Sequence, residues 1–575
     1  MPKRLLILTT ALAGLTFCLC LFNGFVGDDE VMIVRNEFYR SLDNLPLLIS
    51  DRYISDSREY FLNSGTYNSS GAVSYRPVNS LSYFLDRALW DLNPFGYHLH
   101  SWLLHLANTA LVFLLAWMVL RQPRMAAWAA ALFGTHPVAA EAVCAISYRH
   151  DLQACFFGLT AIILYIRFRS SGRKAWLAGS LLCYGLAVFS KESAVLLPAV
   201  LLAYEWFFER QRGEKGWLKH LVPTAAYGFV TAFYIWVYLV VFPNSAVGHN
   251  PAPGTTAGAH IAYMLMLLGR YLSMWLLPLT VRPLPGLFDP AREPNLINPL
   301  STVLFCGLLV ITIVARRRDR DFMFFTVMAA AFYLPAANII PLANPMAHRF
   351  LYLPAAGLSV AVMILLDQVS LPRLSVDIRR FLRLGLVTAA VFTSFTVTVA
   401  WKDNLTLAHS WTRDYPRHAK GHAILGIATF RRGDCDKAVP ALQRAVQLGD
   451  RDPRLFFMLG RCAVPDDNLA AAYYRQALAL APDYAAPYRG LGQIAALQGD
   501  YESALRDLRR SVDLQPALAA YRYAARCYMA LERPAGWSDW YRRAQTQLSP
   551  AELEILRGDL AGTILAGPSG LSPAP

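Results

Sequence analysis

Apolar runs long enough to cross a bilayer recur along most of this chain. A transmembrane helix needs about 20 mainly apolar residues, and such runs return from Leu5 until residue 401. With a mean hydropathy of +0.32 and only 16% charged residues, they exclude a wholly soluble protein, a disordered chain and a small disulfide scaffold. The eleven runs that we expect to span cover residues 5–26, 98–120, 125–146, 152–168, 175–190, 193–208, 221–243, 297–315, 322–342, 350–367 and 382–401.

The basic residues predict the orientation of these spans. Lys3 and Arg4 precede the first run, which we interpret as a retained signal anchor with its N-terminus in the cytoplasm. The run Ile261 to Leu279 is also apolar enough to span, but its crossing would place Arg316 to Arg318 outside. We therefore expect it to be re-entrant or interfacial. The net charge of +14 is then explained by basic residues in the cytoplasmic loops. It therefore does not indicate nucleic-acid binding, and we expect no nucleic-acid partner.

The segment from 27 to 97 is too long for a simple connector. It carries aromatic and apolar clusters around Phe61 and Phe84 that could form helices at the membrane interface. A loop of this length without its own function is uncommon in a compact domain. We expect a folded outer loop with a role in function.

The sequence after Trp401 becomes rich in Ala, Arg, Leu and Tyr, and it repeats itself. Leu-Gly pairs end at Gly426, Gly460 and Gly492, at spacings of 34 and 32 residues. This is the tetratricopeptide period of about 34 residues, in which helix pairs stack into a solenoid. Such arrays bind peptides or proteins along a concave groove. The alternative is that this one only stabilises its own membrane domain.

The nine cysteines include no CxxC pair, which argues against a zinc site or a redox dithiol. Cys435 and Cys462 could pair if the repeats face an oxidising compartment.

Several ionisable residues are expected on the outer side of the membrane, where they are candidates for function. They are Asp28, Asp29, Glu30, His98, His105, His136, Glu141, Arg149, Asp151, Lys191, Glu192, His348 and Arg349. His98 and His105 share a helix face, but a structural role for each is more common than metal ligation.

The cations in the short outer loops oppose the usual insertion bias. An anion at the outer interface would compensate Arg149, Lys191 and Arg349, and a lipid-linked phosphate is one such anion. The alternative is pairing with Asp151, Glu192 and lipid headgroups.

The acidic pair Asp28 and Asp29 follows the first span directly. A carboxylate there could take a proton from an acceptor hydroxyl. An aspartate that caps an interfacial helix would look the same.

Longer motifs in this chain resemble the transmembrane and tetratricopeptide-repeat O-mannosyltransferases (the TMTC family) and their bacterial relatives. They are FVGDD from Phe25, YRPV from Tyr75, LNPFGYHLHSWLLHLAN from Leu92, HPVAAEAV from His136, RHD from Arg149, SKES from Ser190 and HRFLYLP from His348. The resemblance extends along the whole chain, and the order of the motifs is more specific than any one of them.

The resemblance implies an all-α, polytopic membrane bundle of the GT-C glycosyltransferase type, followed by the solenoid. It implies inverting transfer of a mannose-like hexose from a polyprenyl phosphate to a hydroxyl, such as Ser or Thr of an exported protein. Asp28 is favoured as the base, with Asp29 beside it. Arg76, Arg149 with Asp151, and Arg349 with Tyr352 match family motifs that contact the donor.

One departure is His348, which stands where relatives often carry an acidic residue. Because of this departure, the sequence does not decide whether the site binds a divalent metal ion. Lipid A or a surface polysaccharide is the alternative acceptor, and a non-catalytic membrane-anchored scaffold is the alternative of another class. A transporter is disfavoured, because the charges gather at one face.

We expect a multi-pass protein of a bacterial inner membrane with the repeats outside the cytoplasm. The expected domains are a glycosyltransferase domain at 1–402 that includes the outer loop 27–97, a linker at 403–417, the repeats at 418–548 and a tail at 549–575.

Overall fold

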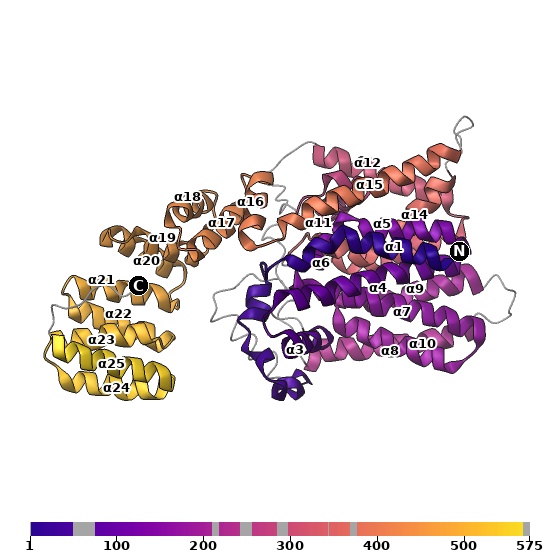
Figure 1. Ribbon diagram of the computed structural model, residues 1–575. Coiled ribbons are helices and arrows are strands. Elements are labelled where there is room, and N and C mark those ends of the chain that lie inside the picture. The colour runs from indigo at the N-terminus through magenta and orange to yellow at the C-terminus, as the bar shows by residue number, and fades with distance from the viewer. Residues whose placement is uncertain are drawn as a thin grey trace. The chain divides into compact units, whose positions relative to one another are not determined.

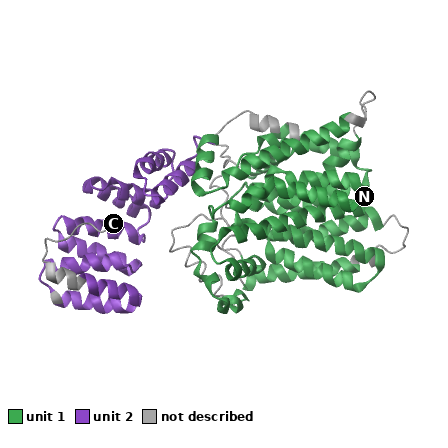
Figure 2. Cartoon of the chain, in the orientation of Figure 1, with its two compact units in different colours: residues 1–414 green, residues 415–575 purple. Residues whose placement is uncertain are grey.

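A computed structural model describes residues 2–49, 75–209, 218–241, 256–283, 297–342, 344–368 and 376–566. These residues form helices and connecting turns and contain no strand, so the expected all-α fold is confirmed. The chain divides into two compact units, residues 1–414 and residues 415–575 (Figure 2). We call them the membrane unit and the repeat unit.

The membrane unit is a bundle of helices that run roughly side by side (Figure 1). Its α-helices are α1 (Pro2–Phe17), α3 (Pro77–Trp90), α4 (Pro94–Leu120), α5 (Pro123–Thr135), α6 (Ala140–Cys144), α7 (Arg149–Ser171), α8 (Lys174–Ser190), α9 (Leu197–Tyr204), α10 (Leu218–Trp236), α11 (Ala257–Leu276), α12 (Ile297–Arg316), α13 (Arg320–Tyr333), α14 (Tyr352–Gln368), α15 (Val376–Ala400) and α16 (Asn404–Asp414).

Six described stretches are long and apolar enough to cross a membrane, which makes this an integral membrane protein. They are Pro2–Phe22, Pro94–Leu120, Ile146–Ser171, Val222–Val241, His348–Gln368 and Ile378–Ala400. The expected total of eleven spans stays a prediction, and so does the interfacial position of 261–279, which α11 largely covers.

The expected span 125–146 is divided into shorter helices. α5 ends at Thr135, and His136 is extended, with φ −72° and ψ 132°. Pro137 explains this break, because a proline disfavours helical geometry in the residue before it. The chain then forms a 3₁₀ turn (Pro137–Ala139), α6 and a second 3₁₀ turn (Ile146–Tyr148) before α7 begins at Arg149.

The described parts of the outer loop are folded. Short turns cover Glu30–Val34, Glu37–Arg40 and Leu42–Ile49, and α3 follows. In α3, Tyr83 and Phe84 are buried, with ring centroids 5.4 and 5.2 Å from the ring of Tyr39. The cluster around Phe84 is therefore a small core between loop segments. The cluster around Phe61 lies outside the described residues.

The repeat unit consists of four successive helix pairs and a final helix, which confirms the tetratricopeptide architecture. The helices are α17 (Ala419–Arg431), α18 (Cys435–Gln447), α19 (Pro453–Ala463), α20 (Asp467–Leu480), α21 (Ala485–Leu497), α22 (Tyr501–Leu514), α23 (Leu518–Ala530), α24 (Pro534–Gln547) and α25 (Pro550–Ala566). The repeated glycines permit close packing inside a pair, since a Cβ on Gly426 would lie 2.5 Å from the Leu442 side chain.

Three further features belong to these units. Within the expected linker, α16 is helical, and within the expected tail, α25 packs against α23 and buries Leu556. Cys435 and Cys462 form a disulfide that joins α18 to α19.

Candidate functional site

Asp29 is a buried carboxylate that holds two distant backbone segments together. Its oxygens accept hydrogen bonds from the amides of Val26 at 3.1 Å, Ile146 at 3.3 Å and Ser147 at 2.6 Å. Burial raises the pKa of Asp29 to about 6, although the hydrogen bonds act in the opposite direction. Asp29 thus fixes the turn after the first span against the segment that leads into α7.

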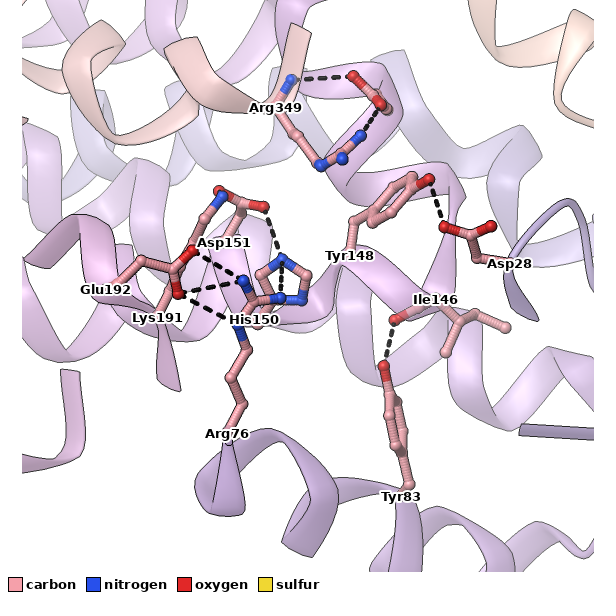
Figure 3. Close-up of polar contacts among 11 residues, drawn as sticks. Asp28, Arg76, Tyr83, Ile146, Tyr148, His150, Asp151, Lys191, Glu192 and Arg349 are labelled. Atoms are coloured by element: carbon pink, nitrogen blue, oxygen red, sulfur yellow. Dashed lines mark hydrogen bonds and ion pairs between the residues drawn. The ribbon is translucent and has the colours of Figure 1, made fainter. Parts of the chain in front are cut away.

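Asp28 has a different environment. It is half-buried, and its Oδ2 accepts a hydrogen bond of 3.0 Å from the hydroxyl of Tyr148 (Figure 3). Because Asp29 holds the neighbouring Ile146 and Ser147, the same contact that fixes the backbone also brings Tyr148 to Asp28.

Arg349 lies on the other side of Tyr148. Its guanidinium carbon is 3.8 Å from the centroid of the Tyr148 ring, which is a cation–π distance. Glu141 on α6 pairs with this guanidinium and also accepts a hydrogen bond of 3.0 Å from the Arg349 amide. Both charged residues are buried, so Glu141 holds Arg349 in a defined position.

Lys191 and Asp151 form a second buried ion pair next to the ring of Phe350. The Lys191 Nζ lies 5.1 Å from that ring centroid, and the guanidinium of Arg349 lies 5.2 Å from it. Burial lowers the pKa of Lys191, and Asp151 opposes this shift. Both cations therefore lie next to the same aromatic side chain.

A third cation comes from the outer loop. Arg76 donates to both Glu192 oxygens at 2.8 and 3.1 Å and lies 3.2 Å from the Nε2 of His150 (Figure 3). Burial would raise the pKa of Glu192, but Arg76 and Lys191 together keep it below its ordinary value. These contacts agree with the alternative in which Asp151 and Glu192 neutralise the outer cations.

Arg149 does not join this group of side chains. It is fully buried and donates to Ser101 and Ser82 at 3.1 Å and to the Tyr97 carbonyl at 2.8 Å, and it also pairs with Asp86. Its partners lie on α3 and α4, so it ties the outer loop to the bundle. This geometry favours a structural role over the expected contact with phosphate.

The remaining sequence candidates lie in the bundle core. His98 contacts the carbonyl of Gly24 at 3.2 Å, and Tyr352 contacts His105 at 2.8 Å. His136 stacks on Trp275, with ring centroids 5.1 Å apart. None of these contacts involves Asp28, Lys191 or Arg349.

The structure gives no support for a metal site in the part of the chain that it describes, where no three His, Cys, Asp or Glu side chains gather as ligands. His348 is buried beside Glu141 and Arg349.

Sequence reasoning missed Tyr148 and Phe350. Both stand directly beside motif residues, Tyr148 before RHD and Phe350 after Arg349, and only that position could have indicated them. The joint arrangement contains a partly exposed carboxylate, an aromatic hydroxyl and three cations, which are suited to accepting a proton and stabilising an anion.

Comparison with known proteins gives related sequences, and no protein-family model matches the chain. The Caenorhabditis elegans protein O-mannosyl-transferase F38B6.6 is 25% identical over 434 residues, which cover 74% of this chain. The human protein O-mannosyl-transferase TMTC2 is 31% identical over 225 residues, or 37% of this chain. The resemblance to TMTC-type protein O-mannosyl-transferases is confirmed. The chain spans only 59% and 26% of these two relatives' lengths.

A solved structure, that of ArnT from Cupriavidus metallidurans bound to undecaprenyl phosphate, is also similar. The match covers 99% of this chain and 89% of ArnT, with 15% sequence identity and a TM-score of 0.32. Values of this size indicate nothing about a shared function.

Proposed function

We propose that this protein is a membrane glycosyltransferase that moves a mannose-like hexose from a polyprenyl phosphate to a hydroxyl of an exported protein. The observation that carries the proposal is Asp28, a partly exposed carboxylate at the end of the first span, held by Tyr148 beside the guanidinium of Arg349. The relatives named above support the class of reaction.

Asp28 acts as the general base in this proposal. It takes the proton of a Ser or Thr hydroxyl while the hydroxyl oxygen forms a bond to the anomeric carbon of the sugar. The bond from that carbon to the phosphate oxygen breaks, and its electron pair leaves with the polyprenyl phosphate. Attack from the face opposite the phosphate inverts the anomeric configuration.

Arg349 stabilises the leaving phosphate, whose negative charge grows as the bond breaks. Glu141 and Tyr148 hold its guanidinium in place before the donor arrives, so little reorganisation is needed. Lys191, next to Phe350, and Arg76 lie in the same region, each held by a carboxylate, and can donate to the phosphate oxygens. Asp29 positions the base and does not react, because three backbone amides occupy its oxygens.

The repeats lie outside the cytoplasm in this proposal, on the side where a lipid-linked sugar meets exported proteins. The Cys435–Cys462 disulfide supports this, because disulfides persist in oxidising compartments.

The deciding experiment replaces Asp28 by asparagine and measures sugar transfer from a synthetic polyprenyl-phosphate mannose to a Ser/Thr-rich peptide. The amide is nearly isosteric but cannot take the proton, so transfer should fall by about 10²- to 10⁴-fold. The matched control is Glu37→Gln, since Glu37 is an exposed carboxylate in the same outer loop that forms a salt bridge with Arg40. A fully active Asp28→Asn enzyme would refute the proposed base, and transfer only to lipid A or polysaccharide would replace the proposed acceptor.

A further inference from the structure

The two helices of each repeat differ in charge. The first helices, α17, α19, α21 and α23, all carry Lys or Arg, and none of these described segments contains Asp or Glu. The second helices, α18, α20, α22 and α24, contain both signs, with acidic residues such as Asp436, Glu502 and Asp539. Within the described helices, the first row therefore carries only positive charge, and the second row carries both signs.

The first helices line the inner face of the solenoid. Successive members of this row contact one another, α17 with α19, α19 with α21 and α21 with α23. In a curved stack of helix pairs, the row whose members lie closest together is on the inside of the curve. The helices that carry only basic residues therefore form the concave face.

Arg461 and Arg489 lie on two neighbouring first helices in the middle of this row. Arg461 is exposed and Arg489 is half-buried, and neither makes an ion pair or hydrogen bond with any described residue. Burial and the neighbouring charge of Arg461 lower the pKa of Arg489. The residues next to them, Gly460 and Gly490, both pack against the Tyr474 ring, since a Cβ on either would lie 2.5 Å from it. Two like charges brought together in this way favour an anionic ligand.

Aromatic side chains lie beside these arginines. The ring of Phe457 on α19 is 5.8 Å from that of Tyr474 and 5.6 Å from that of Tyr484. Tyr474 also packs so closely on α21 that a Cβ on Gly490 would lie 2.5 Å from its ring. Phe457 and Tyr484 are both half-buried, so each still presents part of its ring to solvent. A ligand here can combine negative charge with apolar contact.

The chain already contains one example of such a contact. At the end of the row, Asp559 of α25 pairs with Arg522 of α23 at 2.5 Å. Here a carboxylate from another segment of the chain pairs with an arginine of a first helix. Among the described residues, no carboxylate pairs with Arg461 or Arg489 in this way.

We propose that the inner face of the repeat unit binds an extended acidic segment of a polypeptide, with Arg461 and Arg489 pairing with its carboxylates and Phe457 contacting its apolar side chains. A polypeptide fits better than an anionic bilayer, because a flat surface meets a concave face only at its rim. The inference rests on the proposed function in one respect only, which is that the segment belongs to the acceptor protein.

The test measures binding of a short fluorescent peptide, rich in Asp and Glu with interspersed Phe, to the full chain in detergent. The same peptide with Asn and Gln in place of Asp and Glu is the comparison. The acidic peptide should bind at least about tenfold more tightly, because each charge-assisted pair contributes more than a neutral hydrogen bond. This difference should shrink as salt concentration rises.

The variant Arg461→Gln/Arg489→Gln should lose about tenfold in affinity for the acidic peptide. The variant Arg509→Gln/Arg510→Gln removes the same charge from exposed positions on α22 and should bind like the unchanged chain. Arg461→Lys/Arg489→Lys keeps the charge and should retain most of the affinity.

Equal binding of both peptides, or equal loss in the two glutamine variants, would overturn the inference. Binding of these arginines to anionic vesicles instead of the peptide would also overturn it. The assay needs no catalysis, and Asp28→Asn should bind the peptide normally, so failure of peptide binding and failure of the proposed transferase reaction can be told apart.

Discussion

Asp28 accepts a hydrogen bond from Tyr148, although the two residues are 120 positions apart in the chain. The same tyrosine ring carries the guanidinium of Arg349 on its face. One side chain therefore contacts both the proposed base and the cation proposed to stabilise the leaving phosphate. Substitutions of Tyr148 can therefore separate the contribution of its hydrogen bond from that of its ring.

We predict that Tyr148→Phe lowers kcat for transfer by roughly 10- to 100-fold with little change in the donor KM. Phenylalanine keeps the ring beneath Arg349 but loses the hydrogen bond to Asp28, and a bond to a charged group is typically worth about 1.5–3 kcal/mol. Tyr148→Leu loses both contacts and should raise the donor KM as well. Steady-state kinetics on both variants will check this, and unchanged kcat in Tyr148→Phe would contradict it.

We predict that Arg349→Gln raises the donor KM and also destabilises the protein. Removing one partner of a buried ion pair costs about 3–5 kcal/mol, because Glu141 is left with an uncompensated buried charge. The double variant Arg349→Gln/Glu141→Gln should recover thermal stability without recovering donor use. Recovery of both would mean that Arg349 is structural only.

Arg149 should behave differently from Arg349. Arg149→Lys cannot reproduce its fixed contacts with Ser101, Ser82, Asp86 and Tyr97, so we predict a lower unfolding temperature. The donor KM of the folded enzyme should stay unchanged. Kinetics at a temperature well below unfolding will test this, and a raised donor KM would return Arg149 to the phosphate site.

Asp29 makes stability depend on pH. Its pKa is about 6 in the folded state, against an ordinary value of 3.8, so between these values the folded state binds more protons than the unfolded state. Stability should therefore be greatest below pH 4 for this group and fall, by roughly 3 kcal/mol, as the pH rises to 6. The measurement is the unfolding temperature of the full chain as a function of pH. The fall in stability between pH 4 and pH 6 should be present in the control variant Asp43→Asn, whose carboxylate is exposed, and absent in Asp29→Asn. Equal slopes in both variants would contradict the prediction.

The proposed topology can be checked in two ways. A reporter fused after Trp411 should be active only outside the cytoplasm, and one fused after Arg318 only inside. Cys435 and Cys462 should resist a thiol-reactive mass label until they are reduced. Reporters active on the same side would mean that 261–279 crosses the membrane.

The sequence was sufficient for the repeats and for the apolar membrane-spanning character of the first unit, because periods and apolar runs are local properties. Asp28 was favoured over Asp29 only through the family resemblance, because the two are identical neighbours whose surroundings depend on Ile146, Ser147 and Tyr148 more than 110 positions away. The contacts of Arg149 were not readable for the same reason, since they depend on Asp86 in a loop without a recognisable pattern, and its expected role at the phosphate stays a prediction. The helix break at His136 could have been predicted from Pro137. The continuous apolar composition of residues 125–146 indicated a single span instead.

The six residues from Ile146 to Asp151 contact a different partner at almost every position, from the Asp29 carboxylate to Lys191. A helix turns by about 100° per residue. Deleting a single residue here would therefore rotate the side chains at the start of α7 to the wrong partners all at once. Such a segment tolerates exchange of a single side chain far better than any change in its length.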